Sequence, residues 1–158
     1  MKINGQKIEG VNVAWAIIPR DPPISIKCIA VLNYDEFNKT VPKPQPPTVV
    51  RPGGVESVDL TDEEYQRKLS ERNGFEYDWM CIKSMVTTGD GDLVWETVDP
   101  TKPETWKNWK IEMESSGFNQ NEIGIVMDGI WKANTLSERM IRAARESFFL
   151  SHPEEKRT

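Results

Sequence analysis

The chain has 158 residues, 37% of them hydrophobic, and a formal net charge of −5. This length allows one ordinary domain or two small ones, with a modest core rather than a large enclosed active site. Its acidic balance disfavours contact with a phosphate backbone, and its apolar runs are far shorter than the roughly 20 residues of a membrane crossing, so neither nucleic acid nor a membrane is an expected partner.

The N-terminus lacks the apolar stretch of a signal peptide, so we expect a cytosolic protein. The charge is uneven, with a net +2 over residues 1–58 and −7 over residues 59–158. The ordinary interpretation of an acidic half is that it keeps the protein soluble.

Cys28 and Cys81 have no CxxC pairing and no neighbouring histidine, so we expect two reduced, buried thiols. His152, the single histidine, lies in the C-terminal tail and favours no histidine-based catalysis.

Residues 1–41 predict a small antiparallel β part. The Asn4-Gly5 pair is typical of a two-residue hairpin, because both residues tolerate positive φ. Apolar residues then alternate with others in two runs, which predicts two strands that face one core. The first run has them at odd positions and the second at even positions: Val11, Val13, Trp15 and Ile17, then Ile24, Ile26, Cys28, Ala30 and Leu32.

The stretch "NYDEFNKT" predicts a short helix that starts at Asn33 or Asp35. Residues 42–58 then form a Pro/Gly-rich linker, since "VPKPQPPTVVRPGG" contains five of the eleven prolines and excludes a regular helix or a central strand. The PxPxPP spacing is compatible with a polyproline ligand, but a semi-rigid connector is the more ordinary interpretation.

A helix is expected within residues 59–88, where the apolar period changes from 2 to about 3.6. Thr61 and Glu64 have the spacing of a capping box at its start. Gly74 is a point where the helix could bend or divide. The residues expected on its buried face are Leu69, Phe75, Trp79, Ile82 and Val86.

Residues 89–100 are expected to form a loop. Asp90, Gly91 and Asp92 resemble part of a calcium loop, but position 12 of a loop that starts at Asp90 is Thr101 instead of glutamate. We therefore expect no metal.

Residues 101–150 predict a compact three-helix unit, because three short helices follow each other with little intervening chain. The first is expected to start at Thr101, with Glu104 completing its cap, and to end at Gly117. The next two are expected to start at the pairs Asn119 with Glu122 and Thr135 with Glu138, and residues 151–158 form a flexible tail. The apolar positions of the three helices are Trp106, Trp109 and Met113; Ile123, Val126, Met127, Ile130 and Trp131; and Met140, Ala144 and Phe148.

No arrangement of residues favours catalysis. Gly53-Gly54 lacks the Lys-Ser/Thr of a phosphate-binding loop, and the serines have no base that the sequence identifies. We therefore expect no enzyme and no cofactor. Six tryptophans in 158 residues instead favour, weakly, a role in protein interaction.

The C-terminal third resembles tail assembly chaperones of long-tailed bacteriophages. The similarity rests on "WETVDP", "PETWKNW", "SGFNQNEI" and "ANTLSERMIRAARESFFL", and extends to "INGQKI", "VLNYDEF" and "PKPQPP" with "RPGG" nearer the N-terminus. It implies a non-enzymatic protein of the host cytoplasm that engages the tape-measure protein, recruits tail-tube subunits and is absent from the mature virion. Such chaperones are often made in a short form and a frameshifted long form.

Under this hypothesis the aromatic side chains Trp106, Trp109, Trp131 and Phe149 contact the partner, whereas the alternative is that these stripes form the protein's own core. Self-association through an exposed strand edge is a further interaction that the sequence allows. Two other functions stay open: a structural component of the tail, with the proline arm tying subunits together, or an acidic phage protein that inhibits a host factor. A strong acidic stripe on one face would favour the inhibitor. Overall the sequence predicts an α+β protein.

Overall fold

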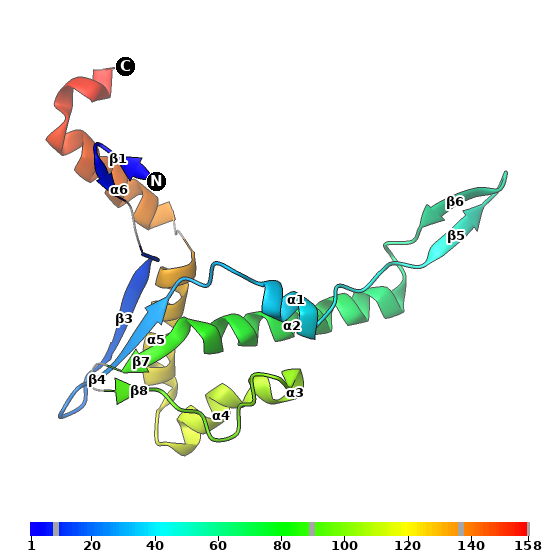
Figure 1. Cartoon of the computed structure of the whole chain (residues 1–158), viewed down its shortest axis with the longest axis horizontal. Coiled ribbons are helices and arrows are strands. Elements are labelled where there is room, and N and C mark those ends of the chain that lie inside the picture. Colours follow the sequence, from blue (N-terminus) through cyan, green and yellow to red (C-terminus); the bar gives the residue numbers. More distant parts are fainter. Residues whose placement is uncertain (8–9, 89–90, 136–137, 158) are drawn as a thin grey trace.

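The computed structural model describes residues 1–7, 10–88, 91–135 and 138–157. It is an α+β structure with antiparallel strands in its N-terminal part and mostly helices after them. The molecule is elongated, with a sheet and helix body at one end and a projecting hairpin at the other (Figure 1).

The strands are β1 (Lys2–Ile3), β2 (Gln6–Lys7), β3 (Val13–Ile18), β4 (Ile24–Ile29), β5 (Thr48–Arg51), β6 (Val55–Val58), β7 (Met85–Thr88) and β8 (Gly91–Asp92). The helices are α1 (Asp35–Thr40), α2 (Glu63–Ser84), α3 (Pro103–Trp106), α4 (Asn108–Ser115), α5 (Gln120–Asn134), α6 (Glu138–Ser151) and the 3₁₀ helix η1 (Pro153–Arg157).

The expected N-terminal hairpin is confirmed, since β1 and β2 pair across Asn4 and Gly5, which both have positive φ. The short helix predicted in "NYDEFNKT" is also confirmed as α1. Its start is secured by Asn33, whose side-chain oxygen accepts a 2.7 Å hydrogen bond from the backbone N–H of Asp35.

The main sheet has the order β3-β4-β7-β8 and is antiparallel throughout. Its third strand, β7, begins directly after α2, whereas the sequence pattern placed Val86 on that helix. The helix ends at Ser84 because Met85 takes an extended conformation and pairs with Cys28 of β4, which buries the Met85 side chain in the core. Gly74 does not divide α2, which runs unbroken for 22 residues.

Helix α5 covers one face of this sheet, and the predicted compact three-helix unit does not form as a separate body. The apolar side of α5 packs against β3 and β4. Helix α6 instead leads away from the body toward the C-terminus (Figure 1). The physical reason is that the sheet has an apolar face of its own, which includes Ile18 and Ile26, and this face must be covered by another element.

The inner face of β3 is the opposite of the one that the alternation suggested. Ala16 and Ile18 are buried under α5, whereas Trp15 and Ile17 are exposed. The small alanine fits because α5 approaches closely at Gly129: a Cβ placed on this glycine would lie 3.1 Å from the Ala16 Cβ. A tryptophan side chain would not fit in that space.

Two of the predicted helix starts differ. Asp62 caps α2 by accepting a 2.8 Å hydrogen bond from the Tyr65 N–H, while Thr61 donates its hydroxyl to Asp59. Thr101 likewise donates to Asp99, and the first C-terminal helix is divided at Lys107 into α3 and α4. In both places the aspartate binds the threonine two residues later, so the hydroxyl is not available to the helix.

One predicted helix start and one predicted helix end are confirmed. The capping box of Asn119 and Glu122 starts α5, with both reciprocal hydrogen bonds present. After α4, Gly117 takes a φ of 88°, and the N–H of Phe118 returns to the Met113 carbonyl. The predicted cap of Thr135 with Glu138 spans residues 136 and 137, and the calcium-like loop includes Asp90; these lie outside the described residues.

Candidate functional site

Trp106 and Trp109, which the sequence proposed as partner contacts, are completely buried. The Trp106 ring packs against Phe37, and its indole N–H donates to the Asp99 carbonyl at 3.1 Å. The Trp109 indole N–H donates to the Asp78 carboxylate at 3.0 Å. Both side chains therefore belong to the core, in agreement with the alternative interpretation, and neither lies on a surface that a partner could reach.

Trp131 and Phe149, the other two proposed contacts, lie nearer the surface. Trp131 is 44% exposed, and its ring lies 6.2 Å from that of Tyr77. Phe149 is partly buried and packs edge-on against Phe148 within α6. The structure does not bring these two residues together with the buried pair into one site.

Three exposed apolar side chains lie in a row on the outer side of β3. We call this surface the β3 face, made by Val13, Trp15 and Ile17, which are 41%, 50% and 52% exposed. Opposite Trp15 and Ile17 across the ladder lie Lys27 and Ser25 of β4. The alternation in the sequence identified these three apolar residues as a set but assigned them to the core.

The β3 strand is held at both ends by α5. Before the strand, the Asn12 side chain donates to the carbonyls of Lys132 and Ala133, both at 2.9 Å. After it, Arg20 donates to both carboxylate oxygens of Glu122 and to the Gly117 carbonyl, all at 2.7 Å. The β3 face is therefore presented on a strand whose position is set by a helix beneath it.

The Arg20 hydrogen bond has an electrostatic consequence for Glu122. Together with the N–H of Asn119, it lowers the pKa of Glu122 to about 2. The carboxylate therefore stays charged over the whole physiological range and keeps both the cap of α5 and the end of β3 in place.

A second polar cluster joins three elements at the other end of the sheet. Ser84 donates its hydroxyl to the Ile29 carbonyl at 2.7 Å, and Asn134 donates to the Ser84 oxygen at 3.0 Å. The Asn134 oxygen accepts from the Val31 N–H at 2.8 Å. These hydrogen bonds connect the ends of α2, β4 and α5 and satisfy their buried polar atoms. The cluster therefore stabilises the fold.

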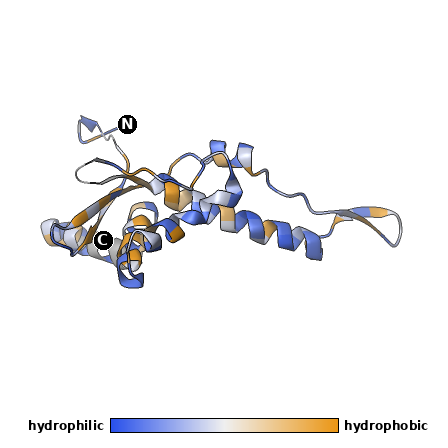
Figure 2. Cartoon of the chain, turned by 90° about the horizontal axis from the view of Figure 1, so that it is seen from below, coloured by the Kyte–Doolittle hydropathy of each residue, from blue (hydrophilic) through white to orange (hydrophobic). Residues whose placement is uncertain are grey.

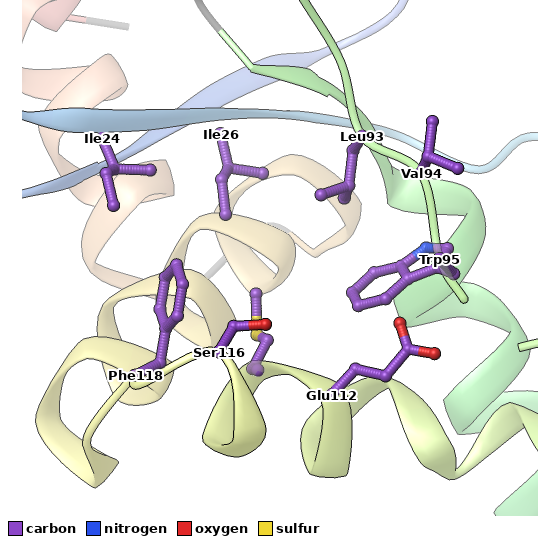
Figure 3. A pocket seen from close by; sticks show the side chains of 9 residues that line it. Ile24, Ile26, Leu93, Val94, Trp95, Glu112, Ser116 and Phe118 are labelled. Carbon is purple, nitrogen blue, oxygen red and sulfur yellow. The ribbon is translucent and has the colours of Figure 1, made fainter. Parts of the chain in front are cut away.

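A small pocket of about 130 Å³ lies between β4, the segment after β8 and α4 (Figure 3). Its lining is mostly apolar, with Ile24 and Ile26 on one side and Phe118 on the other. The only carboxylate in the lining, Glu112, accepts hydrogen bonds from the backbone of Glu96 and from Thr97. Burial raises the pKa of Glu112, but the hydrogen bonds from Thr97 and from the backbone of Glu96 and Val98 together outweigh it and lower the pKa overall. This pocket suits an apolar side chain better than a charged ligand.

Two titratable groups of the core are the buried thiols of Cys28 and Cys81. Burial raises the pKa of Cys28 to about 11 and that of Cys81 to about 12, so both thiols are protonated at neutral pH. Across the ranges that the structure describes, no three His, Cys, Asp or Glu side chains are grouped as metal ligands would be.

No known protein family, curated protein or solved structure matches the chain. Of the helices in the described part of the chain, none combines the length and the apolar character that a membrane crossing requires.

Proposed function

We propose that this protein is a non-enzymatic tail assembly chaperone of a long-tailed bacteriophage, which binds the tape-measure protein and tail-tube subunits in the host cytoplasm and leaves before the virion is complete. The sequence resemblance supports this function, and the observation that carries it is the β3 face, an apolar surface left uncovered on a strand held by α5. The proposal includes no cofactor, metal or catalytic residue.

The arrangement of layers explains how such a partner would bind. A sheet with one helix-covered face and one apolar open face is completed when a second helix packs on the open side. A tape-measure protein is expected to present long apolar helical surface, and one such helix would cover Val13, Trp15 and Ile17 at once. Trp15 would act as the central anchor, because a partly exposed tryptophan supplies a large contact area.

The proposed contact is also suited to release. The β3 face is a short stretch of one strand, and Lys27 lies beside Trp15 in the neighbouring strand. A small apolar patch with a polar border is typical of a reversible contact rather than of an obligate interface. Trp131 is an additional candidate contact because it is exposed, although it lies on α5 rather than on the sheet.

The direct test is co-expression with the tape-measure protein encoded by the same phage. The double variant Trp15→Ser/Ile17→Ser should reduce the amount of tape-measure protein that stays soluble and co-purifies, by at least tenfold. The matched control is Ile111→Ser, which removes an equally exposed apolar side chain from α4. Undiminished capture by the double variant, with a normal melting temperature, would contradict the assignment of the β3 face.

Mass spectrometry distinguishes a chaperone from a component of the virion. In infected-cell lysate the chain should be abundant, and in purified tailed particles it should be nearly absent. If purified particles contained the chain in a fixed ratio to the tail proteins, the chain would be a structural component of the virion and not a chaperone.

That structural role is the second candidate, and the projecting hairpin of β5 and β6 favours it, because a projecting hairpin is suited to linking subunits.

The third candidate, an acidic inhibitor of a host factor, depends on a stripe of unpaired acidic residues. On α2, acidic residues alternate with basic partners, as in the pairs of Arg67 with Glu64 and of Arg72 with Glu76, so the charges observed on this helix do not support it.

A further inference from the structure

The hairpin of β5 and β6 stands apart from the rest of the molecule. We call residues 42–58 the arm: a proline-rich segment followed by this hairpin, which projects beyond the end of α2 (Figure 1). Its two strands pair only with each other. Figure 2 shows hydrophobic residues in this projecting part, and the exposed ones are Val49, Val50, Val55 and Val58.

An isolated hairpin of this kind is only marginally stable in water. Two strands of four residues each supply one ladder of hydrogen bonds, and each strand leaves its outer edge unpaired. The valines on both sides of the hairpin leave part of their apolar surface in water in the single chain. The arm therefore has the features of an element that is completed by a third strand from elsewhere.

A matching open edge occurs in the same chain. Strand β3 has six residues, pairs with β4 on one side, and pairs with no strand of the described chain on the other. The remaining edge strands of the described sheets, β1, β2 and β8, have two residues each and offer far fewer backbone groups. Beside the open edge of β3 lies the apolar β3 face, which would extend over the valines of an added hairpin.

The arm and β3 lie at opposite ends of the long axis of the molecule (Figure 1). The arm leaves α1 through Pro42, Pro44, Pro46 and Pro47, which favour an extended, stiff segment that does not fold back. The matching edge within its reach is therefore the one on a neighbouring molecule.

We propose that the arm of one copy adds to the open edge of β3 in a second copy, so that the four-stranded sheet becomes six-stranded across the contact. Backbone hydrogen bonds supply the pairing, and the valines of the arm continue the β3 face. The contact joins two different surfaces, so each copy can give its arm to one neighbour and receive an arm from another. Such a contact produces rings or filaments when the two neighbours are different molecules, and a closed dimer when two copies exchange arms.

The first test removes the hairpin of the arm, residues 48–58, without disturbing the body. The N–H of Asp59 donates to the Pro47 carbonyl at 2.8 Å, so the two ends of the hairpin already meet, and two glycines can replace residues 48–58. In sedimentation velocity, the full chain should form dimers or larger species as its concentration rises to about 100 µM, while the shortened chain stays monomeric. A full chain that stays monomeric, or a shortened chain that still assembles, would overturn the proposal.

The second test is disulfide cross-linking, which does not depend on the shortened chain folding. One partner carries Val49→Cys or Val50→Cys, which point to opposite sides of the hairpin, and the other carries Val13→Cys, Trp15→Cys or Ile17→Cys. Mild oxidation of a mixture should join an arm variant to a β3 variant at one or more of these positions, because paired strands bring the side chains within disulfide distance. Cross-links only between two arm variants would show that arms pair with each other, and would refute the proposal.

The native thiols do not interfere, because Cys28 and Cys81 are buried. The control partner is Ile111→Cys, exposed on α4 and away from the sheet, which should give no cross-link with the arm variants. Cross-linking of Ile111→Cys as strongly as of the β3 variants would indicate random collision and sink the proposal. This inference does not rest on the chaperone function: the shortened chain keeps the β3 face, so it should still bind the tape-measure protein if that function is right.

Discussion

Gly129 lies where α5 crosses the sheet, and its lack of a side chain permits the close contact between them. A Cβ at this position would lie 3.1 Å from the Ala16 Cβ and 3.3 Å from the Cys28 sulfur. Gly129→Val should therefore lower the free energy of unfolding by about 1–3 kcal/mol, the usual cost of overpacking a core. The measurement is urea unfolding followed by tryptophan fluorescence.

The control for this change is Gly124 on the same helix, where an added Cβ would meet no neighbouring atom within 4 Å. Gly124→Val should change stability by less than about 0.5 kcal/mol, since an exposed helix position responds only to helix propensity. Equal effects of the two valine substitutions would mean that close packing at Gly129 is not the cause.

Trp109 and Trp79 are both buried but differ in their polar contacts. The Trp109 indole N–H donates to Asp78, whereas no acceptor within the described chain reaches the buried indole nitrogen of Trp79. Trp109→Phe should thus cost about 1–3 kcal/mol more than Trp79→Phe, because only the first leaves a partner without its hydrogen bond. Chemical denaturation of the two variants side by side measures the difference, and an equal loss would contradict this explanation.

The start of α5 depends on one charged carboxylate, and this makes its contribution sensitive to acid. The pKa of Glu122 is about 2 in the folded protein and about 4.3 in an unfolded chain. A lowered pKa stabilises the fold fully above the unfolded value, and that stability is lost as the pH falls toward 2. Glu122→Gln should therefore be less stable than the wild type at pH 7, and the two should converge between about pH 4.5 and pH 2.

Thermal unfolding at a series of pH values measures this convergence. In a background that carries Arg20→Gln, the same Glu122→Gln change should have a smaller effect, because the hydrogen bond from Arg20 is the main cause of the lowered pKa. A gap between wild type and Glu122→Gln that is constant from pH 7 to pH 2 would rule out this linkage.

The arm and the body of the molecule should differ in local stability. The backbone hydrogen bonds of β5 and β6 are exposed to solvent, whereas those of β4 and α5 lie in the core. In a dilute sample, hydrogen exchange should be fast over residues 48–58 and slow over residues 24–29 and 120–134. Slow exchange of the arm in a monomeric sample would show that it is stable alone, which would remove the reason for adding it to a second sheet.

Signals that act between neighbouring residues were predicted from the sequence. The positive φ of Asn4 and Gly5, the cap of Asn119 with Glu122 and the helix end at Gly117 all depend on the conformations of a few adjacent residues. The predicted caps of Thr61 and Thr101 were wrong. Each threonine has the right spacing for a cap, but its hydroxyl donates to an aspartate two residues earlier. Which of the two local hydrogen bonds forms depends on the path of the chain before the helix.

The β3 face could be predicted from the sequence only in part, because its exposure depends on contacts between distant residues. Alternation identified Trp15 and Ile17 as lying on one side of a strand, but the side that becomes the core depends on what packs against it. That is α5, more than 100 residues later in the chain, where Gly129 accepts an alanine and excludes a tryptophan. The burial of Trp106 and Trp109 likewise depends on Phe37 and Asp78, which are distant in the sequence.

The amino-acid sequence alone therefore predicts the α+β class, with antiparallel strands in the N-terminal part and mostly helices after them. It also predicts the turn at Asn4-Gly5, the cap of α5 and the helix end at Gly117, because these follow from backbone preferences and the period of apolar residues. The strand order of the sheet, the conversion of Met85–Thr88 from a helix end to a strand, the covering of the sheet by α5 and the exposure of β3 required the folded chain. Each of these features depends on which segments, distant in the sequence, pack or pair with each other. The preferences of neighbouring residues do not decide that choice.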